Sequence, residues 1–316
     1  MGREKQSVGE RIRGYKAVAM LIGAMSLAGS SVVVGKMLVA TVPVFVAAFG
    51  SLLVAFLCMI PLMHGRFGEL RLLTAREWMY LFLQGLCGIV LFRVFTLYGL
   101  HMTGAAQAGI ITGATPAVLA ILSLVLLGER FSVRMAAGIV LAALGCMVIN
   151  VFALEGGGEN NVLGSLLVGA AVVCEALFTI FRKRICHSVS ATTNTAVLIF
   201  CSLLLLAVPA AVELGTAPVR LSPKALLAIG YYGVFATVLA YLLWTSAVGK
   251  VSGATAGAAT AAMPASSVIL AVLVLGEPPY WHHLAGCLLI VSGILVTSVR
   301  PPASIRIIPA TDRNNR

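Results

Sequence analysis

The sequence contains ten separate apolar runs, each about as long as a helix that crosses a lipid bilayer. A hydrocarbon core of about 30 Å needs roughly 20 helical residues at 1.5 Å each. The runs are continuous in Leu, Val and Ala, whereas the strands of a membrane barrel would alternate polar and apolar residues. We therefore expect an all-α integral membrane protein with ten transmembrane helices. The runs lie near residues 17–35, 43–62, 77–99, 103–127, 133–152, 161–183, 190–213, 224–247, 251–275 and 281–299.

The composition excludes the classes of protein that fold in water. Hydrophobic residues make up 60% of the 316 residues and charged residues 10%, against about 45–50% and about 25% in soluble proteins. The seven cysteines contain no C-x-x-C pair, and no spacing of His101, His282 and His283 suggests a metal site. We expect no metal, no cofactor and no disulfide framework.

The basic residues are distributed unevenly between alternate connecting segments. One set of segments contains 18 Lys and Arg residues, the other contains three (Lys36, Arg220 and Lys224), and Arg93 lies inside a run. Because cytoplasmic segments carry the excess of positive charge, both termini are predicted to be cytoplasmic. These cations are interpreted as orientation signals that meet lipid headgroups, and no nucleic-acid partner is expected. The larger set comprises Arg3, Lys5, Arg11, Arg13, Lys16, Arg66, Arg71, Arg76, Arg130, Arg134, Arg182, Lys183, Arg184, Lys250, Arg300, Arg306, Arg313 and Arg316.

The sequence repeats itself at an offset of 148 residues. Each unit contains five predicted helices, an odd number, so the second copy must enter the membrane from the opposite side. A 5+5 inverted repeat is typical of secondary transporters. We expect a basic segment at 1–16, repeats at 17–152 and 161–299, and a basic tail at 300–316. The coincident pairs are Pro116 with Pro264, Gly128 with Gly276, Glu129 with Glu277, Gly138 with Gly286, and Gly145 with Gly293.

This duplicated pattern resembles the EamA domain of the drug/metabolite transporter superfamily. The resemblance rests on a small-residue helix with a mid-span proline, a Gly-Glu pair at its end, and two further glycines, all present twice. It covers about 17–299. It implies export of amino acids, other metabolites or toxic compounds across a bacterial inner membrane. It also implies a central cavity lined by the third, fourth, eighth and ninth helices, with contributions from the first and sixth.

The two prolines interrupt helices rich in small residues. Pro116 and Pro264 each remove a backbone donor near Thr112 and Thr260. A break at mid-membrane can act as a hinge or present a carbonyl to substrate, so we expect hinges at the prolines and substrate contacts near the threonines. A kink that serves only packing is the alternative. Glu129 and Glu277 end their helices on opposite faces, together with Gly128 and Gly276, where capping or ion pairing is the expected role.

Two ionisable residues lie well inside the runs. Charged groups at this depth usually face a cavity or a partner. Arg93 can bind a carboxylate or phosphate, or its side chain can extend to the outer headgroups. Glu175 can bind an amine or carry a coupling proton, or it can pair with Arg182 or Arg184. Helix positions place Arg93 and Glu175 at different depths, so no direct contact between them is expected.

The eighth run offers one polar and aromatic face. Gly230, Val234, Thr237, Tyr241 and Trp244 recur every three or four residues, which places them on the same side of a helix. We predict that Thr237, Tyr241 and Trp244 line the substrate site. Anchoring of Trp244 at the membrane interface is the alternative.

These observations together predict a secondary transporter and no enzyme. We expect alternating access to a small-molecule site, export of amino acids or related metabolites, and a monomer in the lipid bilayer. No Walker A loop is present, so transport driven by ATP in this chain is excluded. Export of drugs or of a secreted chelator, proton coupling, and facilitated diffusion all remain open. An intramembrane enzyme is disfavoured, because the clustered His, Asp or Glu residues that such enzymes need are missing. A membrane sensor is disfavoured, because it would not require an inverted repeat.

Overall fold

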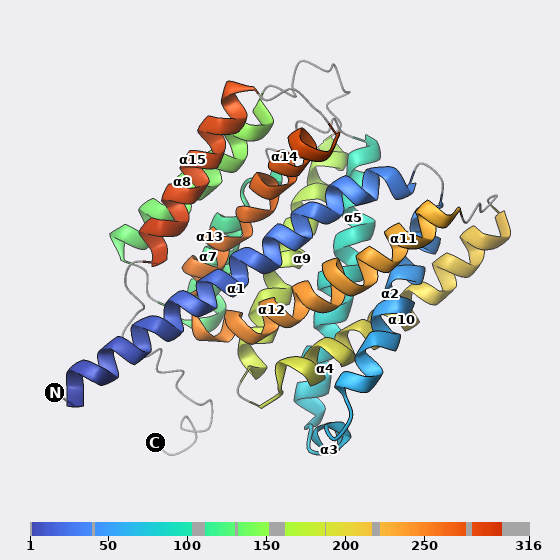
Figure 1. The fold of residues 1–316 in the computed structure, drawn as a ribbon, viewed down its shortest axis with the longest axis horizontal. Coiled ribbons are helices and arrows are strands. Elements are labelled where there is room, and N and C mark those ends of the chain that lie inside the picture. The colour runs from blue at the N-terminus through green and yellow to red at the C-terminus, as the bar shows by residue number, and fades with distance from the viewer. Residues whose placement is uncertain are drawn as a thin grey trace.

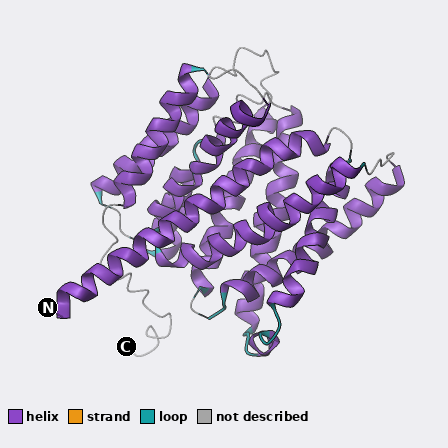
Figure 2. Cartoon of the chain, viewed as in Figure 1, coloured by secondary structure: helices purple, strands orange, loops and turns teal. Residues whose placement is uncertain are grey.

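The computed structural model describes residues 2–39, 42–102, 111–129, 132–151, 162–186, 188–216, 222–275 and 280–298, and these are helices joined by short loops (Figures 1 and 2). The predicted all-α class is confirmed for this part of the chain. The helices are α1 (Gly2–Val39), α2 (Val44–Leu62), α3 (Phe67–Arg71), α4 (Ala75–Gly85), η1 (Leu86–Leu91), α5 (Phe92–Met102), α7 (Thr115–Leu127), α8 (Val133–Val151), α9 (Val162–Ile185), α10 (Ala191–Thr216), α11 (Pro223–Tyr231), η3 (Tyr232–Leu239), α12 (Ala240–Ala247), η4 (Val248–Lys250), α13 (Gly253–Thr260), α14 (Ala262–Leu275) and α15 (Trp281–Ser298).

Six helical stretches in the described residues are long and apolar enough to cross a membrane. Shorter apolar helices accompany them at Thr115–Leu127, Val133–Val148 and Trp281–Thr297. Large hydrophobic side chains on the outside of the bundle stay exposed, among them Val208, Leu227 and Leu273, at 71–75%. A lipid environment accounts for such a surface, whereas a soluble protein rarely exposes large apolar patches.

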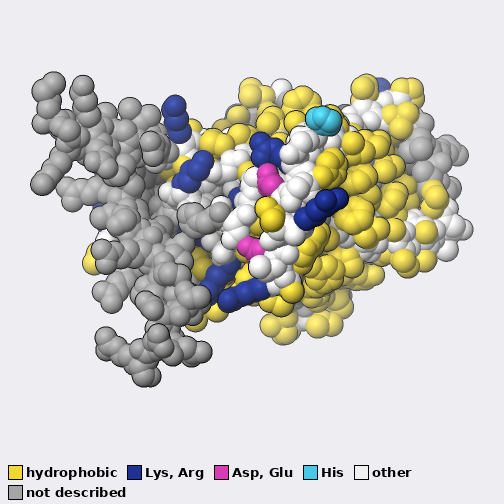
Figure 3. Space-filling model, turned by 90° about the horizontal axis from the view of Figure 1, so that it is seen from below, with side chains coloured by type: hydrophobic (Ala, Val, Ile, Leu, Met, Phe, Trp, Pro, Cys, Tyr) yellow, Lys and Arg dark blue, Asp and Glu magenta, His cyan; other side chains and the backbone are white. Residues whose placement is uncertain are grey.

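Charged side chains gather at one end of the molecule. Figure 3 views the lower end of Figure 1, where α3 lies, and shows cationic and acidic side chains with hydrophobic side chains around them. On α3, Glu69 pairs with Arg66 at 3.2 Å. This end of the bundle is therefore polar, whereas the sides of the bundle are apolar.

The repeat glycines produce a close contact between two helices. Helices α8 and α15 lie side by side (Figure 1), and a Cβ on Gly145 would sit 2.7 Å from the carbonyl oxygen of Gly286. The equivalent contact brings Gly138 against the carbonyl of Gly293, at 2.8 Å. Small residues allow helix backbones to approach where lipid removes the hydrophobic drive. The four glycines of the repeat therefore all lie in this contact, and each meets the glycine of the other coincident pair.

Helices α2 and α10 form a second pair that joins the repeats. An acidic side chain from one repeat meets the start of the helix in the other: Glu213 accepts a hydrogen bond from the Val46 amide at 2.9 Å, and Glu69 accepts one from the Thr193 hydroxyl at 2.6 Å. Burial raises the pKa of Glu69, but hydrogen bonds from Ser190, Thr193 and Arg66 outweigh it and leave the pKa below its ordinary value. A negative charge is stabilised at a helix N-terminus.

Four of the long apolar runs are interrupted by irregular helix. The third and eighth runs each contain a π-helical segment, Leu86–Leu91 and Tyr232–Leu239, and these overlap at the 148-residue offset. In the ninth run, α13 ends at Thr260 and α14 begins at Ala262, while in the fourth run α7 begins at Thr115 after a turn. π-Helical turns and breaks at membrane depth are tolerated where they line a cavity or are buried in protein.

Candidate substrate cavity

A cavity of about 320 Å³ lies between the two repeats. This volume falls at the lower end of the roughly 300–1,000 Å³ typical of small-molecule sites. Its wall is built by α1, α2, η1 and α5 of the first repeat and by α9, η3, α12 and α14 of the second. The first, third, sixth, eighth and ninth runs thus contribute as expected. The second contributes as well, through Ser51 and Leu52, and none of the described residues of the fourth does.

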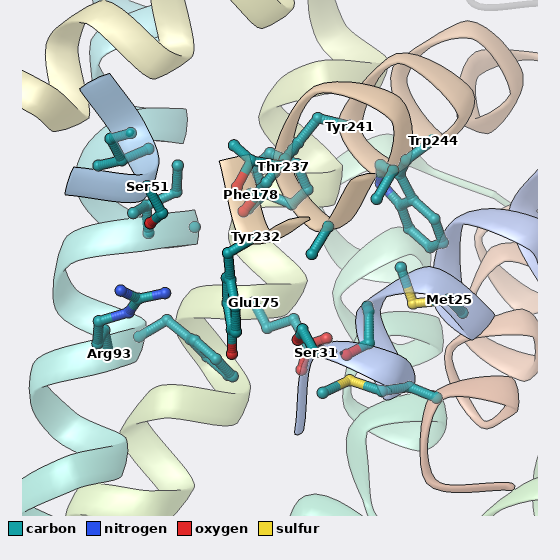
Figure 4. A pocket seen from close by; sticks show the side chains of 18 of the residues that line it. Met25, Ser31, Ser51, Arg93, Glu175, Phe178, Tyr232, Thr237, Tyr241 and Trp244 are labelled. Carbon is teal, nitrogen blue, oxygen red and sulfur yellow. Dashed lines mark hydrogen bonds between the residues drawn. The ribbon is translucent and has the colours of Figure 1, made fainter. Parts of the chain in front are cut away.

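Arg93 and Glu175 both line this cavity, and they are the only charged residues among the described residues of its wall. Figure 4 shows the guanidinium of Arg93 on one side, Trp244 and Met25 on the other, and Glu175 between them in the view. In the described part of the chain no ion pair joins Arg93 to Glu175, as their depths predicted. Both charges therefore face the space that a substrate would fill.

The wall opposite Arg93 is aromatic. Phe178 and Tyr241 pack edge to face with their ring centroids 5.7 Å apart. Trp244 is 3% exposed, so it lies in the interior and is not an anchor at the membrane interface. Its indole Nε1 is buried without a hydrogen-bond partner in the described residues. Because a buried donor without a partner costs about 1–3 kcal/mol, this nitrogen favours a ligand that brings an acceptor.

The π-helix changes which residues of the eighth run face the cavity. Thr237, Tyr241 and Trp244 line it, but Gly230 and Val234 do not, and Val234 is 37% exposed. That the three bind substrate stays a prediction. A regular helix would have kept all five on one face. The i→i+5 hydrogen bonds of η3 wind the chain more loosely than an α-helix, so the face turns between Val234 and Thr237.

The internal repeat relates the residues on the two sides of the cavity. At the 148-residue offset, Arg93 corresponds to Tyr241 and Thr96 to Trp244, and all four line the wall. The hydroxyl of Thr96, like the indole nitrogen of Trp244, has no hydrogen-bond partner among the described residues. Sequence reasoning missed Thr96, although applying the offset to Trp244 would have found it.

The other predicted contacts lie elsewhere. Thr112 and Thr260 do not line the cavity, because their side chains sit at the helix breaks. The Thr260 hydroxyl donates to the carbonyl of Gly257 at 2.6 Å. Pro116 occupies the first turn of α7, where its missing N–H is least costly, and Pro264 lies near the start of α14. Their action as hinges and the threonines' binding of substrate stay predictions.

Glu129 forms an interior ion pair at the end of the cation-rich helix α9. Its carboxylate pairs with Lys183 and accepts the amide of Gly253, the first residue of α13. Lys183 also donates to the carbonyl of Val251 at 3.0 Å. Capping and ion pairing were the roles expected of this glutamate. Gly128 ends α7 with φ +67°, a left-handed conformation that glycine adopts readily, while Gly276 and Glu277 lie outside the described residues.

Arg182, beside Lys183, is also buried. It donates to the carbonyls of Thr245 and Val189 at 3.0–3.1 Å and is 3% exposed. Arg184 donates to the carbonyl of Leu126. Arg182 and Lys183 thus bind partners in the interior of the protein and do not contact lipid headgroups. This corrects the sequence-based interpretation of both residues as headgroup partners. With Arg182 and Arg184 engaged on carbonyls, neither is the partner of Glu175.

Comparison with known proteins places this architecture in a family. The model of the EamA-like transporter family matches residues 15–151 and again 162–299. The chain is 35% identical to uncharacterized transporter YetK of Bacillus subtilis, over 90% of this chain and 87% of that protein. It is 26% identical to a probable terminal-alkyne amino-acid exporter of Streptantibioticus cattleyicolor, over 72% and 75%. A crystal structure with 20% identity shares the fold, with a TM-score of 0.75 over 90% of this chain and 98% of that one. The chain therefore belongs to the EamA-like transporter family, a multi-pass membrane family in the drug/metabolite transporter superfamily.

Proposed function

We propose that this chain is a secondary transporter that exports amino acids or related small metabolites across the bacterial inner membrane. It would span the membrane ten times, with both termini in the cytoplasm, as repeats 17–152 and 161–299 that rock about one cavity. The transporter would work as a monomer and need no cofactor. The balance of 18 to three cations between alternate segments supports this orientation.

One observation carries the proposal: among the described residues, one cation and one anion face a small cavity with aromatic walls. A zwitterion offers a carboxylate to Arg93 and an amine to Glu175, and its apolar side chain can lie against Phe178 and Tyr241. The similarity to a protein named as a probable terminal-alkyne amino-acid exporter supports export as the direction of transport. Glu175 is also the candidate for proton coupling, since a carboxyl group can release and take up a proton when substrate comes and goes.

Counterflow in proteoliposomes tests this proposal. Vesicles would be loaded with unlabelled compound and supplied with labelled leucine, phenylalanine, lysine or glutamate, or with tetraphenylphosphonium as a cationic drug. Wild type is expected to exchange at least one neutral amino acid. Arg93→Ala and Glu175→Gln are each expected to lose about 10-fold or more, because a hydrogen bond to a charged group contributes about 1.5–3 kcal/mol.

Arg71→Ala is the matched control, since this arginine is exposed at the end of α3 and should exchange at the wild-type rate. Unchanged exchange in both cavity variants would remove Arg93 and Glu175 from the mechanism. Exchange of tetraphenylphosphonium without any amino acid would favour drug export.

A further inference from the structure

We infer that the hydroxyl of Thr115 holds Glu175 only in its protonated form and so links the proton on this carboxyl to the proline break in the fourth run. Thr115 precedes Pro116 and begins α7. Its oxygen lies 2.7 Å from the carbonyl of Thr112 and 3.5 Å from Oε2 of Glu175. Thr115 would thus be a positioning residue that acts through Glu175. The inference rests on the proposed function only for its role in transport.

The first contact follows from the proline. In a regular helix the amide of residue 116 would donate to the carbonyl of Thr112, but Pro116 has no N–H. The Thr115 hydroxyl supplies a donor to that carbonyl, at the 2.7–2.8 Å preferred for O–H···O bonds. The proton of the Thr115 hydroxyl is therefore donated to the Thr112 carbonyl at the helix break.

The second contact follows from the first. A threonine hydroxyl has one proton but two lone pairs, so with its proton on Thr112 it can only accept from Glu175. A protonated carboxyl can donate to it, whereas an ionised one cannot. At 3.5 Å this contact is longer than a strong hydrogen bond, so a small rotation of the Glu175 side chain makes or breaks it. Loss of the proton frees Glu175 to face Arg93 or a substrate amine.

The second repeat shows that the break does not need this hydroxyl. The position equivalent to Thr115 is Met263, beside Pro264, and the helix is interrupted there as well, between Thr260 and Ala262. The position equivalent to Glu175 is Leu27. The offset thus relates two pairs of positions, each with one member in either repeat: Thr115 with Glu175 carries both the hydroxyl and the carboxyl, and Met263 with Leu27 carries neither. A function shared between them explains this difference better than the needs of the break.

Few other titratable groups face Glu175. Arg93 on α5, Tyr241 on α12 and Tyr232 on η3 line the same cavity, and Cys146 on α8 lies within electrostatic reach. The residues that α1, α2 and α14 contribute to the wall are not ionisable, and neither is any residue of α7. Cys87 on η1 and Cys174 on α9 add a hydrogen-bonded thiol pair next to the wall residues Gly88 and Glu175. None of these groups is a carboxyl, so a carboxyl band that arises in this cavity reports on Glu175.

Infrared titration of the carboxyl band of Glu175 tests the contact with Thr115. The band would be identified in nanodiscs by its loss in Glu175→Gln, with no substrate present. Thr115→Val keeps the shape but removes the hydroxyl, and it is expected to lower the titration midpoint by about 0.4–1 pH unit, since a bond to the neutral form is lost. Thr115→Ser should restore the wild-type midpoint. An unchanged or raised midpoint in Thr115→Val, or an equal shift in Thr115→Ser, would overturn the inference.

Hydrogen exchange tests the link to the break. At a pH above the midpoint, Glu175→Gln, whose amide can always donate, is expected to slow exchange in the peptide covering 111–127 relative to wild type. Adding Thr115→Val should abolish that difference, as coupled sites do in a double-mutant cycle. A difference that persists without the hydroxyl, or no difference at all, would overturn the link. Both measurements are independent of transport, so failure to find a substrate leaves them readable.

Discussion

Lys183→Met is expected to destabilise the folded protein by about 3–5 kcal/mol, because it leaves the buried carboxylate of Glu129 without its cation. Glu129 and Lys183 are 9% and 5% exposed, so water cannot replace the lost charge. Among the described residues, the carboxylate would keep only the amide of Gly253 as a hydrogen-bond partner. The free energy of unfolding measured in detergent micelles by denaturant titration checks this value.

Two further variants separate this effect from a general loss of charge. Glu129→Gln combined with Lys183→Met should recover much of the stability, since replacing both members of a buried pair is often nearly neutral. Lys250→Met removes an exposed lysine at the end of η4 and should change stability by less than about 1 kcal/mol. A wild-type unfolding curve for Lys183→Met would show that the pair does not tie the repeats together.

Gly145→Leu is expected to separate α8 from α15. A Cβ at this position would sit 2.7 Å from the Gly286 carbonyl and 2.9 Å from the Ile290 amide, and backbone cannot move aside as a flexible side chain can. Overpacking of this kind costs about 1–3 kcal/mol and occasionally more. A fall in the thermal unfolding midpoint of the purified protein would measure it.

Gly169→Leu is the matched control, on α9. A Cβ there meets nothing within 4 Å, and glycine within a helix costs about 0.5–1 kcal/mol relative to alanine, so this variant should be as stable as wild type or more so. If both leucine variants unfold alike, the close approach of α8 and α15 is not a determinant of stability.

The repeat made much of this architecture predictable. The paired glycines that coincide at an offset of 148 residues proved to be the contacts between α8 and α15, and the two ionisable residues inside apolar runs proved to share one cavity. Both signals are strong because glycine and charge are costly in a transmembrane helix unless they have a structural or functional role.

The remaining features depend on geometry that the sequence pattern does not encode. A period of 3.6 residues assumes a regular helix, so it could not anticipate that η3 would turn Gly230 and Val234 away from the cavity. Counting charges treated Lys183 as a headgroup partner, because burial depends on Glu129, 54 residues away in sequence. Thr115 was missed because its role depends on Glu175, a residue on another helix.

The central claim is that the cavity between the repeats is the path of the substrate, and filling it is the most direct test. Ala236 lines the cavity on η3, whereas Leu239, on the same π-helix, is 39% exposed on the outside. In counterflow of the amino acid that wild type exchanges, Ala236→Trp should lose at least about nine-tenths of the rate, because an indole occupies space the substrate needs. Leu239→Trp should retain the wild-type rate. Wild-type counterflow by Ala236→Trp, in protein that is folded and inserted, would contradict the account.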